Sequence, residues 1–239
     1  MTNTAWAIVA LKSPATAKSR LSLCLTELER RDLFFIMAAR VINALQQTPG
    51  IARVLVVTAA AEVVQFARDL HAEILDQRRD AGTAAAFAHA IDALAALPVL
   101  QRPDSALLIA GDLPLISPTA VSSVLQYAGG GIAIVPDRQR IGTNALLCSP
   151  PGLLPPSFGG NSFIKHCNMA AALGLPVHVH ESDALGLDID VADDLKCLET
   201  RLNRLSTKPD DDALIALLRR ARPMTSSSHL DCLGYAYPS

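Results

Sequence analysis

The chain has 239 residues and is 50% hydrophobic, so it can bury a sizeable core as one α/β domain and is short for two. A formal net charge of -2 gives no field that would attract a polyanion, which disfavours nucleic acid and anionic membranes as partners. The 5 cysteines are scattered without a Cys-x-x-Cys pair, and no apolar run approaches the roughly 20 residues needed to span a bilayer. We therefore expect a cytoplasmic protein without a disulfide framework, a zinc knuckle or a membrane span.

Predicted strands and helices alternate along the first half of the chain. Thr26 and Glu29 have the spacing of a capping box ahead of a helix that runs to about Leu45, and Ser117 is a plausible N-cap for a later helix. The predicted strands are residues 5–11, 53–58, 72–75 and 106–110, and the further helices are 62–70, 84–97 and 118–127. This alternation predicts βαβ crossovers, a mostly parallel sheet and helices on both of its faces.

The pattern loosens in the second half. The predicted strands are residues 132–136, 145–148, 177–180 and 185–189, and the helices are 162–174, 191–202 and 213–220. We expect one domain over residues 1–205, followed by a C-terminal helix and a mobile Ser-rich tail within residues 206–239.

Asp112 directly follows the predicted strand 106–110, within Gly111-Asp112-Leu113-Pro114. Ligands collect at the carboxyl ends of the strands in an open parallel sheet, so Asp112 is placed where a metal and its substrate would sit. An isolated Gly-Asp of this kind could equally cap a turn.

Asp188 and Asp190 are two residues apart, which on an extended strand puts both carboxylates on one face. Together with Asp112 they would form a hard, oxygen-lined site suited to Mg²⁺. Asp190 has an alternative role as a cap of the last helix.

Three cations follow the first strand: Lys12, Lys18 and Arg20. They could bind a triphosphate, or they could form an ordinary basic surface loop. Neither a Walker A loop nor a dinucleotide fingerprint is present.

Two Gly-containing turns could hold an anion. Gly142-Thr143-Asn144 and the segment 159–162 each combine glycine with a hydroxyl, and the helix beginning near Ser162 would present free N–H groups. Either turn alone is also ordinary turn chemistry. His166 is a further candidate to face an acceptor pocket, whereas His178 and His180 are better explained as structural.

As a set, these motifs resemble the 2-phospho-L-lactate guanylyltransferase family, relatives of the molybdenum-cofactor guanylyltransferases. The resemblance rests on Ala17-Lys18-Ser19-Arg20-Leu21, Gly111-Asp112-Leu113-Pro114, Gly142-Thr143-Asn144-Ala145-Leu146, residues 159–163 with His166, and Leu187-Asp188-Ile189-Asp190. It implies a Rossmann-like nucleotidyltransferase fold that uses GTP and Mg²⁺.

The resemblance also implies roles for individual residues. Asp112, Lys18 and Arg20 would be catalytic, and Asp112, Asp188 and Asp190 would hold the metal. Thr143, Gly159 and Ser162 would bind the acceptor phosphate. With this reaction, the cations after the first strand, Lys12, Lys18 and Arg20, would bind the nucleotide together with Gly82.

The implied reaction moves GMP from GTP to the phosphate of a small phosphorylated carboxylic acid, such as 2-phospholactate, phosphoenolpyruvate or 3-phosphoglycerate, in deazaflavin coenzyme biosynthesis. The alternatives are transfer to a sugar phosphate or molybdopterin, and a nucleotide-binding protein without turnover. A second copy of the chain and the transferase that uses the product are candidate partners. The base, the acceptor and the oligomeric state stay open.

Overall fold

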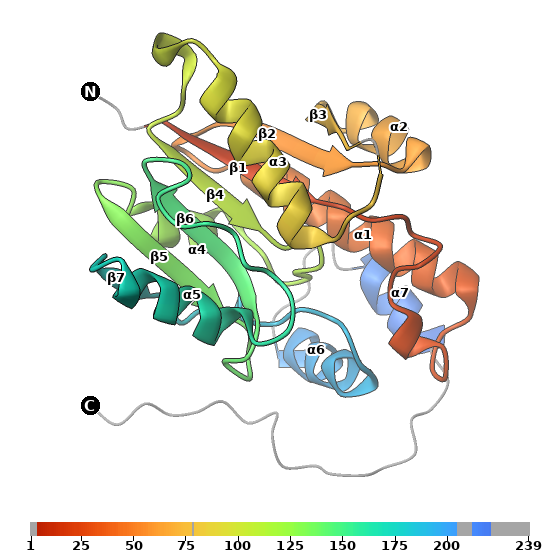
Figure 1. The fold of residues 1–239 in the computed structure, drawn as a ribbon. Coiled ribbons are helices and arrows are strands. Elements are labelled where there is room, and N and C mark those ends of the chain that lie inside the picture. Colours follow the sequence, from red (N-terminus) through yellow and green to blue (C-terminus); the bar gives the residue numbers. More distant parts are fainter. Residues whose placement is uncertain (1–3, 78, 205–211, 221–239) are drawn as a thin grey trace, which may run out of the picture.

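A seven-stranded sheet with the order β3-β2-β1-β4-β6-β5-β7 forms the centre of the computed structural model (Figure 1). The structure describes residues 4–77, 79–204 and 212–220. The strands are β1 (Ala5–Ala10), β2 (Ile51–Thr58), β3 (Glu73–Asp76), β4 (Ser105–Ile109), β5 (Gly131–Pro136), β6 (Thr143–Ser149) and β7 (Val177–Val179).

Strand direction decides which residues meet at the functional edge. β1, β2, β3 and β4 pair in parallel, whereas β6 runs antiparallel to both β4 and β5. Ala110 N donates to Asn144 O at 2.8 Å, so the first residues of β6 lie beside the carboxyl end of β4. The predicted mostly parallel sheet is confirmed, and its one reversed strand brings Thr143 to the edge where Asp112 lies.

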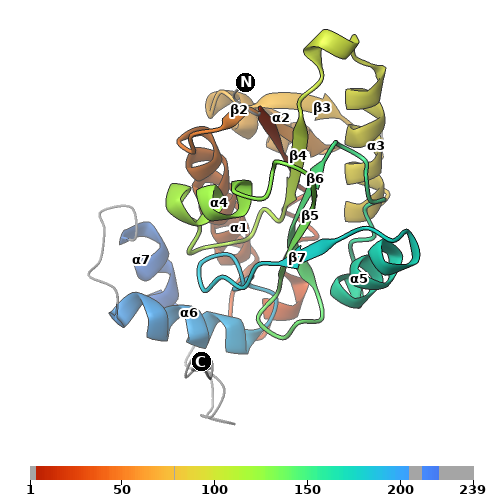
Figure 2. The same ribbon diagram turned by 90° about the vertical axis from the view of Figure 1, so that its left-hand side faces the viewer.

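Helices cover both faces, as predicted (Figure 2). The helices are α1 (Glu27–Gln46), α2 (Ala61–Asp69), α3 (Thr83–Ala96), α4 (Pro118–Leu125), α5 (Ser162–Ala172), α6 (Ala192–Arg204) and α7 (Asp212–Arg220). One core cluster joins α1, α2 and α4 to one face, and a second joins α3 and α5 to the other. Apolar side chains of helices therefore pack on each face of the sheet. This packing holds in place the strand ends at which the functional residues lie.

Local capping explains where two of these helices begin. Thr26 Oγ1 accepts from Glu29 N at 3.3 Å, and Glu29 Oε2 accepts from Thr26 N at 2.8 Å, which is the predicted capping box of α1. Ser117 Oγ accepts from Ala120 N and caps α4, also as predicted.

A third core cluster lies beside the sheet, between α1, α6 and α7. It includes Leu33 of α1, Leu198 of α6 and Leu214 of α7, all fully buried. The C-terminal helix therefore packs against the rest of the described chain. The predicted Ser-rich tail lies outside the described residues. None of the helices that the structure describes is both long and apolar enough to cross a membrane.

The prediction of a strand at residues 185–189 is wrong, because this segment is irregular and pairs with no strand. Leu187 and Ile189 are buried in the third cluster, against helices. The alternation of apolar and acidic residues therefore reflects packing beside α1 and α6 and not a place in the sheet. The other predicted elements are present, with ends displaced by at most two residues.

Candidate active site

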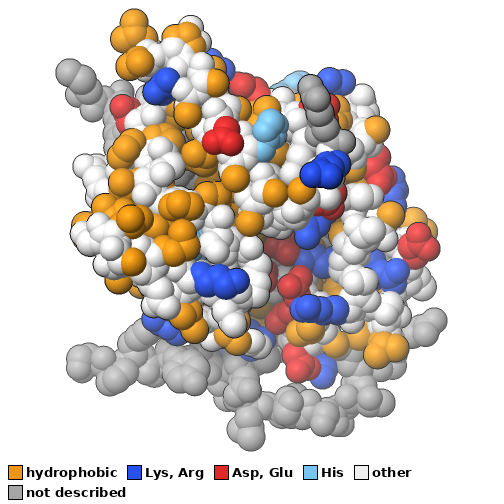
Figure 3. Space-filling view, viewed as in Figure 1, with side chains coloured by type: hydrophobic (Ala, Val, Ile, Leu, Met, Phe, Trp, Pro, Cys, Tyr) orange, Lys and Arg blue, Asp and Glu red, His pale blue; other side chains and the backbone are white. Residues whose placement is uncertain are grey.

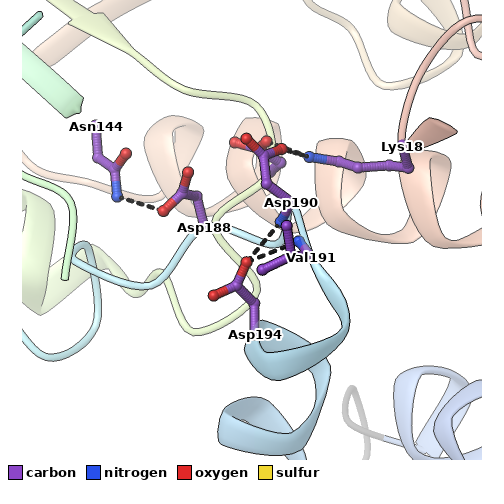
Figure 4. Close-up of polar contacts among 7 residues, drawn as sticks. Lys18, Asn144, Asp188, Asp190, Val191 and Asp194 are labelled. Carbon is purple, nitrogen blue, oxygen red and sulfur yellow. Dashed lines mark hydrogen bonds and ion pairs between the residues drawn. The ribbon is translucent and has the colours of Figure 1, made fainter. Parts of the chain in front are cut away.

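Three carboxylates converge beside the carboxyl end of β4, and Figure 4 shows two of them, Asp188 and Asp190. Asp112 follows β4, whereas Asp188 and Asp190 come from the irregular segment before α6. One oxygen from each carboxylate lies within 4.8 Å of the other two. The structure thus brings together the three acids that the sequence singles out, although the two from the irregular segment do not reach the site along a strand.

Close packing of Gly111 against the side chains at the end of β1 helps to place Asp112. A Cβ atom on Gly111 would lie 2.3 Å from Leu11 Cδ2 and 3.3 Å from Val9 Cγ1, so a larger residue at this position would require the Leu11 side chain to move. Leu113 on the other side is fully buried and anchors the turn. Asp112 is therefore held between two packed neighbours while its own side chain keeps 27% of its surface exposed.

Two polar side chains outside the predicted set position the other acids (Figure 4). Asn144 Nδ2 donates to Leu185 O at 2.9 Å and to Asp188 Oδ1 at 3.4 Å. Asp194 Oδ2 accepts from the backbone N–H groups of Asp190 and Val191, each at 2.9 Å. Asp194 therefore fixes the two backbone N–H groups that directly precede α6.

The sequence contains a partial indication that Asn144 and Asp194 belong to the site. Asn144 is adjacent to Thr143 in the predicted anion-binding turn, and Asp194 belongs to an acidic pair in the first turn of a predicted helix. Their partners lie about 40 and four residues away, respectively, so only the second contact follows from local spacing.

The side chain of Lys18 contacts the group formed by Asp112, Asp188 and Asp190, which we call the acid cluster. Its Nζ contacts Asp112 Oδ2 and lies 3.0 Å from Asp190 Oδ1, and its side chain is 7% exposed. Burial by itself would lower the pKa of Lys18, but the charges of Asp112 and Asp190 outweigh it and raise the pKa above its usual value. Lys18 is therefore a permanent positive charge of this site.

The single positive charge of Lys18 does not neutralise the negative charge of three carboxylates, Asp112, Asp188 and Asp190. Burial, followed by the charges of Asp112 and Asp190, raises the pKa of Asp188 to about 7. A divalent cation would relieve this repulsion, and carboxylate oxygens are the ligands that Mg²⁺ prefers. The donor set therefore fits the predicted Mg²⁺.

The acids line the larger of two adjoining cavities (Figure 3). Its volume is about 680 Å³, and its wall includes Lys18, Arg20, Thr143, Gly159 and Ser162 in addition to the acids. The smaller cavity, about 480 Å³, lies at the carboxyl ends of β1 and β2 and at the start of α3. Both cavities are lined by Lys12 and Thr83, and in Figure 3 acidic and basic side chains gather in the hollow at the centre of the face.

Gly82 lies in the smaller cavity, at the N-cap of α3. Its φ of 92° is in the region that favours glycine, and its N–H donates to Asp80 Oδ1 at 2.9 Å. A Cβ atom at this position would meet nothing within 4 Å, so the backbone faces open space.

Hydroxyl groups are the donors of the predicted acceptor region. Thr143 and Ser162 are buried to 6% and 2% exposure, respectively, and both line the larger cavity. Gly159, with φ 122°, supplies a backbone that other residues would strain to adopt.

Three of the N–H groups that the sequence suggests are free at these turns donate to other residues of the chain, which corrects that interpretation for these three. Ser162 N and Phe163 N, the first two amides of α5, donate to the carbonyls of Gly159 and Ile141, each at 3.1 Å. Gly142 N donates to Asp137 Oδ2 at 2.8 Å.

Three histidines, His166, His178 and His180, contact neighbouring side chains within the described fold. His166 is fully buried behind Thr143, with Nδ1 3.0 Å from Thr143 Oγ1, so it does not itself line the cavity as the sequence suggested. His178 stacks on Tyr127 with ring centroids 3.6 Å apart, and His180 Nε2 lies 3.0 Å from Ser123 Oγ.

Solved structures of low sequence identity share the fold. A nucleotidyl transferase from Methanothermobacter superposes with a TM-score of 0.61 at 18% identity, over 84% of this chain and 99% of that one. A 4-diphosphocytidyl-2C-methyl-D-erythritol synthase from Anaerococcus prevotii gives 0.58 at 10% identity, over 85% and 97%. The fold is the Rossmann-like fold of nucleotidyltransferases.

Sequence relatives are more specific. A phosphoenolpyruvate guanylyltransferase from Rubrobacter xylanophilus is 39% identical over 203 residues, which cover 81% of this chain and 93% of the relative. A 2-phospho-L-lactate guanylyltransferase from Methanothermobacter thermautotrophicus is 32% identical over 189 residues, 79% of this chain and 81% of the relative. A family model described as "Guanylyl transferase CofC like" matches residues 5–207. The chain is a nucleotidyltransferase and belongs to the CofC-like guanylyl transferase family.

Proposed function

We propose that this protein transfers GMP from GTP to the phosphate of a small phosphorylated carboxylic acid and releases pyrophosphate, as a step of deazaflavin coenzyme biosynthesis. The observation that carries the proposal is the larger cavity, where the acid cluster, the cations Lys12, Lys18 and Arg20, and the hydroxyls of Thr143 and Ser162 line one space. A reaction between two phosphates needs these parts together: cationic groups for each phosphate and a fixed direction of attack.

The nucleotide side of the proposal uses the smaller cavity. Gly82 leaves open space at the start of α3, where a ligand can approach the backbone closely. Lys12 lines both cavities, so a nucleotide in the smaller cavity would extend its phosphates past this ammonium group toward Lys18 and Arg20. These cations would hold the β- and γ-phosphates and stabilise the pyrophosphate as it leaves.

The acceptor side needs no strong base, because the attacking phosphate oxygen is already an anion. Thr143 and Ser162 would donate hydrogen bonds that orient this phosphate, and Gly159 would allow it to approach the backbone. Alignment and charge neutralisation, not proton abstraction, would therefore supply most of the rate enhancement.

The metal is part of the proposal. Asp112, Asp188 and Asp190 would hold Mg²⁺, which when bound supplies charge neutralisation of the reacting phosphates. Lys18, paired with Asp112 and Asp190, compensates part of the same negative charge within the chain itself.

The names of the sequence relatives favour one class of acceptor. They are named for phosphoenolpyruvate and for 2-phospho-L-lactate, two phosphorylated three-carbon acids, which supports a small phospho-acid over a sugar phosphate or molybdopterin. We keep 3-phosphoglycerate as the third acceptor to be tested. A homodimer and a complex with the transferase that uses the product stay predictions of the family resemblance.

A panel of substrates tests the proposal. The purified protein would be incubated with Mg²⁺, with GTP, ATP or CTP, and with each phospho-acid or glucose 1-phosphate in turn, while pyrophosphate release is followed. We expect release with GTP and one phospho-acid. Release only with a sugar phosphate would replace the proposed acceptor class, and no release from any pair would favour a nucleotide-binding protein without turnover.

A further inference from the structure

His166 is buried at a junction between three segments that lie apart in the sequence. It belongs to α5 and has no exposed surface. Its Nε2 lies 2.8 Å from Ser157 N, and its Nδ1 lies 3.0 Å from Thr143 Oγ1. The ring of Phe158 packs edge-on against it, with centroids 5.2 Å apart.

These two contacts specify where the imidazole proton resides. A backbone N–H can only donate, so Nε2 must be the unprotonated, accepting nitrogen beside Ser157. A neutral ring then carries its proton on Nδ1, which faces Thr143. Burial, with a smaller effect of Lys165, lowers the pKa of His166 to about 4, so the ring is neutral at neutral pH.

The tautomer in turn fixes the Thr143 hydroxyl. Its oxygen accepts from Nδ1–H, and among the described residues no other hydrogen bond engages this hydroxyl. The hydroxyl proton is then free to be donated into the larger cavity, which Thr143 lines. Ser162 is four residues before His166 and therefore lies on the same face of α5.

We propose that His166 is a positioning residue that holds the Thr143 hydroxyl as a hydrogen-bond donor toward the cavity, and that this pair selects an anionic oxygen as its ligand. An oxygen without a proton accepts from a donor held in this way and forms the stronger hydrogen bond when it is charged, whereas an ammonium group has no lone pair with which to accept. The assignment of this oxygen to the acceptor phosphate rests on the proposed function; the tautomer and the direction of the hydroxyl do not.

Two substitutions separate the two hydrogen bonds of His166. His166→Asn keeps an amide donor near the position of Nδ1 and loses the acceptor for Ser157 N–H. His166→Gln can keep an acceptor near Nε2 and loses the donor to Thr143. Thr143→Val removes the hydroxyl at nearly constant volume. We expect the KM of the acceptor to rise roughly tenfold or more in His166→Gln and Thr143→Val, to stay within about threefold of wild type in His166→Asn, and the KM of GTP to change little in all three.

Equal losses in His166→Asn and His166→Gln would show a merely structural residue and overturn the proposal. So would a loss confined to GTP. Thermal unfolding of each variant checks that the chain is folded under the assay conditions.

The tautomer itself is measured on the wild-type protein by ¹⁵N NMR of the imidazole nitrogens at pH 7, without any turnover. We expect a protonated Nδ1 and an unprotonated Nε2. A proton on Nε2, or a doubly protonated ring, would overturn the inference. If this spectrum is as expected and no phospho-acid is turned over, the proposed function fails while the His166–Thr143 arrangement stands.

Discussion

Lys18 has a left-handed backbone conformation, with φ 57° and ψ 28°, immediately before the short helix Ser19–Leu21. A non-glycine residue adopts this conformation at a cost of about 1 kcal/mol or more. The ion pairs of Lys18 with Asp112 and Asp190 offset the cost of this backbone conformation. The conformation turns the Lys18 side chain toward the two acids. We infer that Lys18 compensates the acid cluster of the free protein with the same ammonium group that would meet the phosphates of a bound nucleotide.

Asp112→Asn tests the acid cluster at its centre. The variant loses a charged oxygen shared by the proposed metal site and Lys18, so kcat/KM should fall by at least roughly 100-fold, about 2.7 kcal/mol in barrier. Steady-state pyrophosphate release measures the effect. Asp193→Asn is a matched control, because Asp193 is exposed and pairs with Lys196 outside the cluster. Near-normal turnover of Asp112→Asn with Mg²⁺ would remove Asp112 from the mechanism.

Arg20→Ala tests the proposed phosphate-binding cations without disturbing the Lys18 pairs. Arg20 lines the larger cavity and is exposed, so the loss should be modest, roughly five- to tenfold in GTP affinity, and smaller for GMP, which lacks the distal phosphates. Titration calorimetry with both nucleotides measures the difference. Arg53→Ala at the amino end of β2 should affect neither, and equal losses for GTP and GMP would place Arg20 away from the distal phosphates.

At the scale of elements, local chemistry was sufficient to predict most boundaries. The capping box of Thr26 and Glu29 spans four residues and could be identified from spacing alone. The structure of segment 185–189 could not be identified in this way. An alternation with a period of two shows that one side of the segment is buried, but it does not show whether a helix or a strand packs against that side. The acids still arrive at the site, since Asn144 and Asp194 fix that segment where no sheet ladder does.

Thr26→Ala removes one half of the capping box of α1. The N–H of Glu29 then loses its side-chain acceptor, and the free energy of unfolding should fall by about 1 kcal/mol. Urea denaturation measures this loss. Thr26→Ser should retain most of the stability, and because Thr26 lies outside both cavities, kcat should be unchanged in both variants. Unaltered stability in Thr26→Ala would mean that the cap contributes nothing to this 20-residue helix.

At the scale of the whole molecule, the antiparallel strand β6 determines which residues meet at the candidate active site. The sequence predicts a strand after Gly142 and implies acceptor binding by Thr143, but it does not show that this strand pairs antiparallel with β4. That pairing brings the first residues of β6 beside the end of β4 and places Thr143 and Asp112 on one cavity. Contacts between residues this far apart in sequence, including that of Thr143 with His166, depend on the assembled sheet and leave no local signal.

The stability of the whole chain should depend on His166 at acidic pH. Burial and, to a smaller extent, Lys165 lower its pKa from 6.5 to about 4. Between these values the unfolded chain binds a proton that the folded chain does not, so this contribution is complete above pH 6.5 and is lost as the pH falls toward 4. The slope is at most about 1.4 kcal/mol per pH unit.

A series of urea denaturations from pH 7.5 to 4.5, with divalent cations removed, measures this dependence. Burial and the neighbouring acids raise the pKa of Asp188 to about 7, which acts in the opposite direction over the same range, so variants are compared with wild type. His166→Gln should lose less stability than wild type on acidification. Identical pH profiles for wild type and His166→Gln would contradict the buried neutral state of His166.

The central claim is that an oxygen of the acceptor phosphate attacks the α-phosphorus of GTP in the cavity lined by the acid cluster. The most direct measurement uses phosphoenolpyruvate labelled with ¹⁸O on its phosphate, together with unlabelled GTP and Mg²⁺, and locates the label by ³¹P NMR and mass spectrometry. We predict that labelled oxygen bridges the two phosphorus atoms of the product and that the pyrophosphate released contains none. A bridging oxygen derived from GTP, or label in the pyrophosphate, would contradict this account.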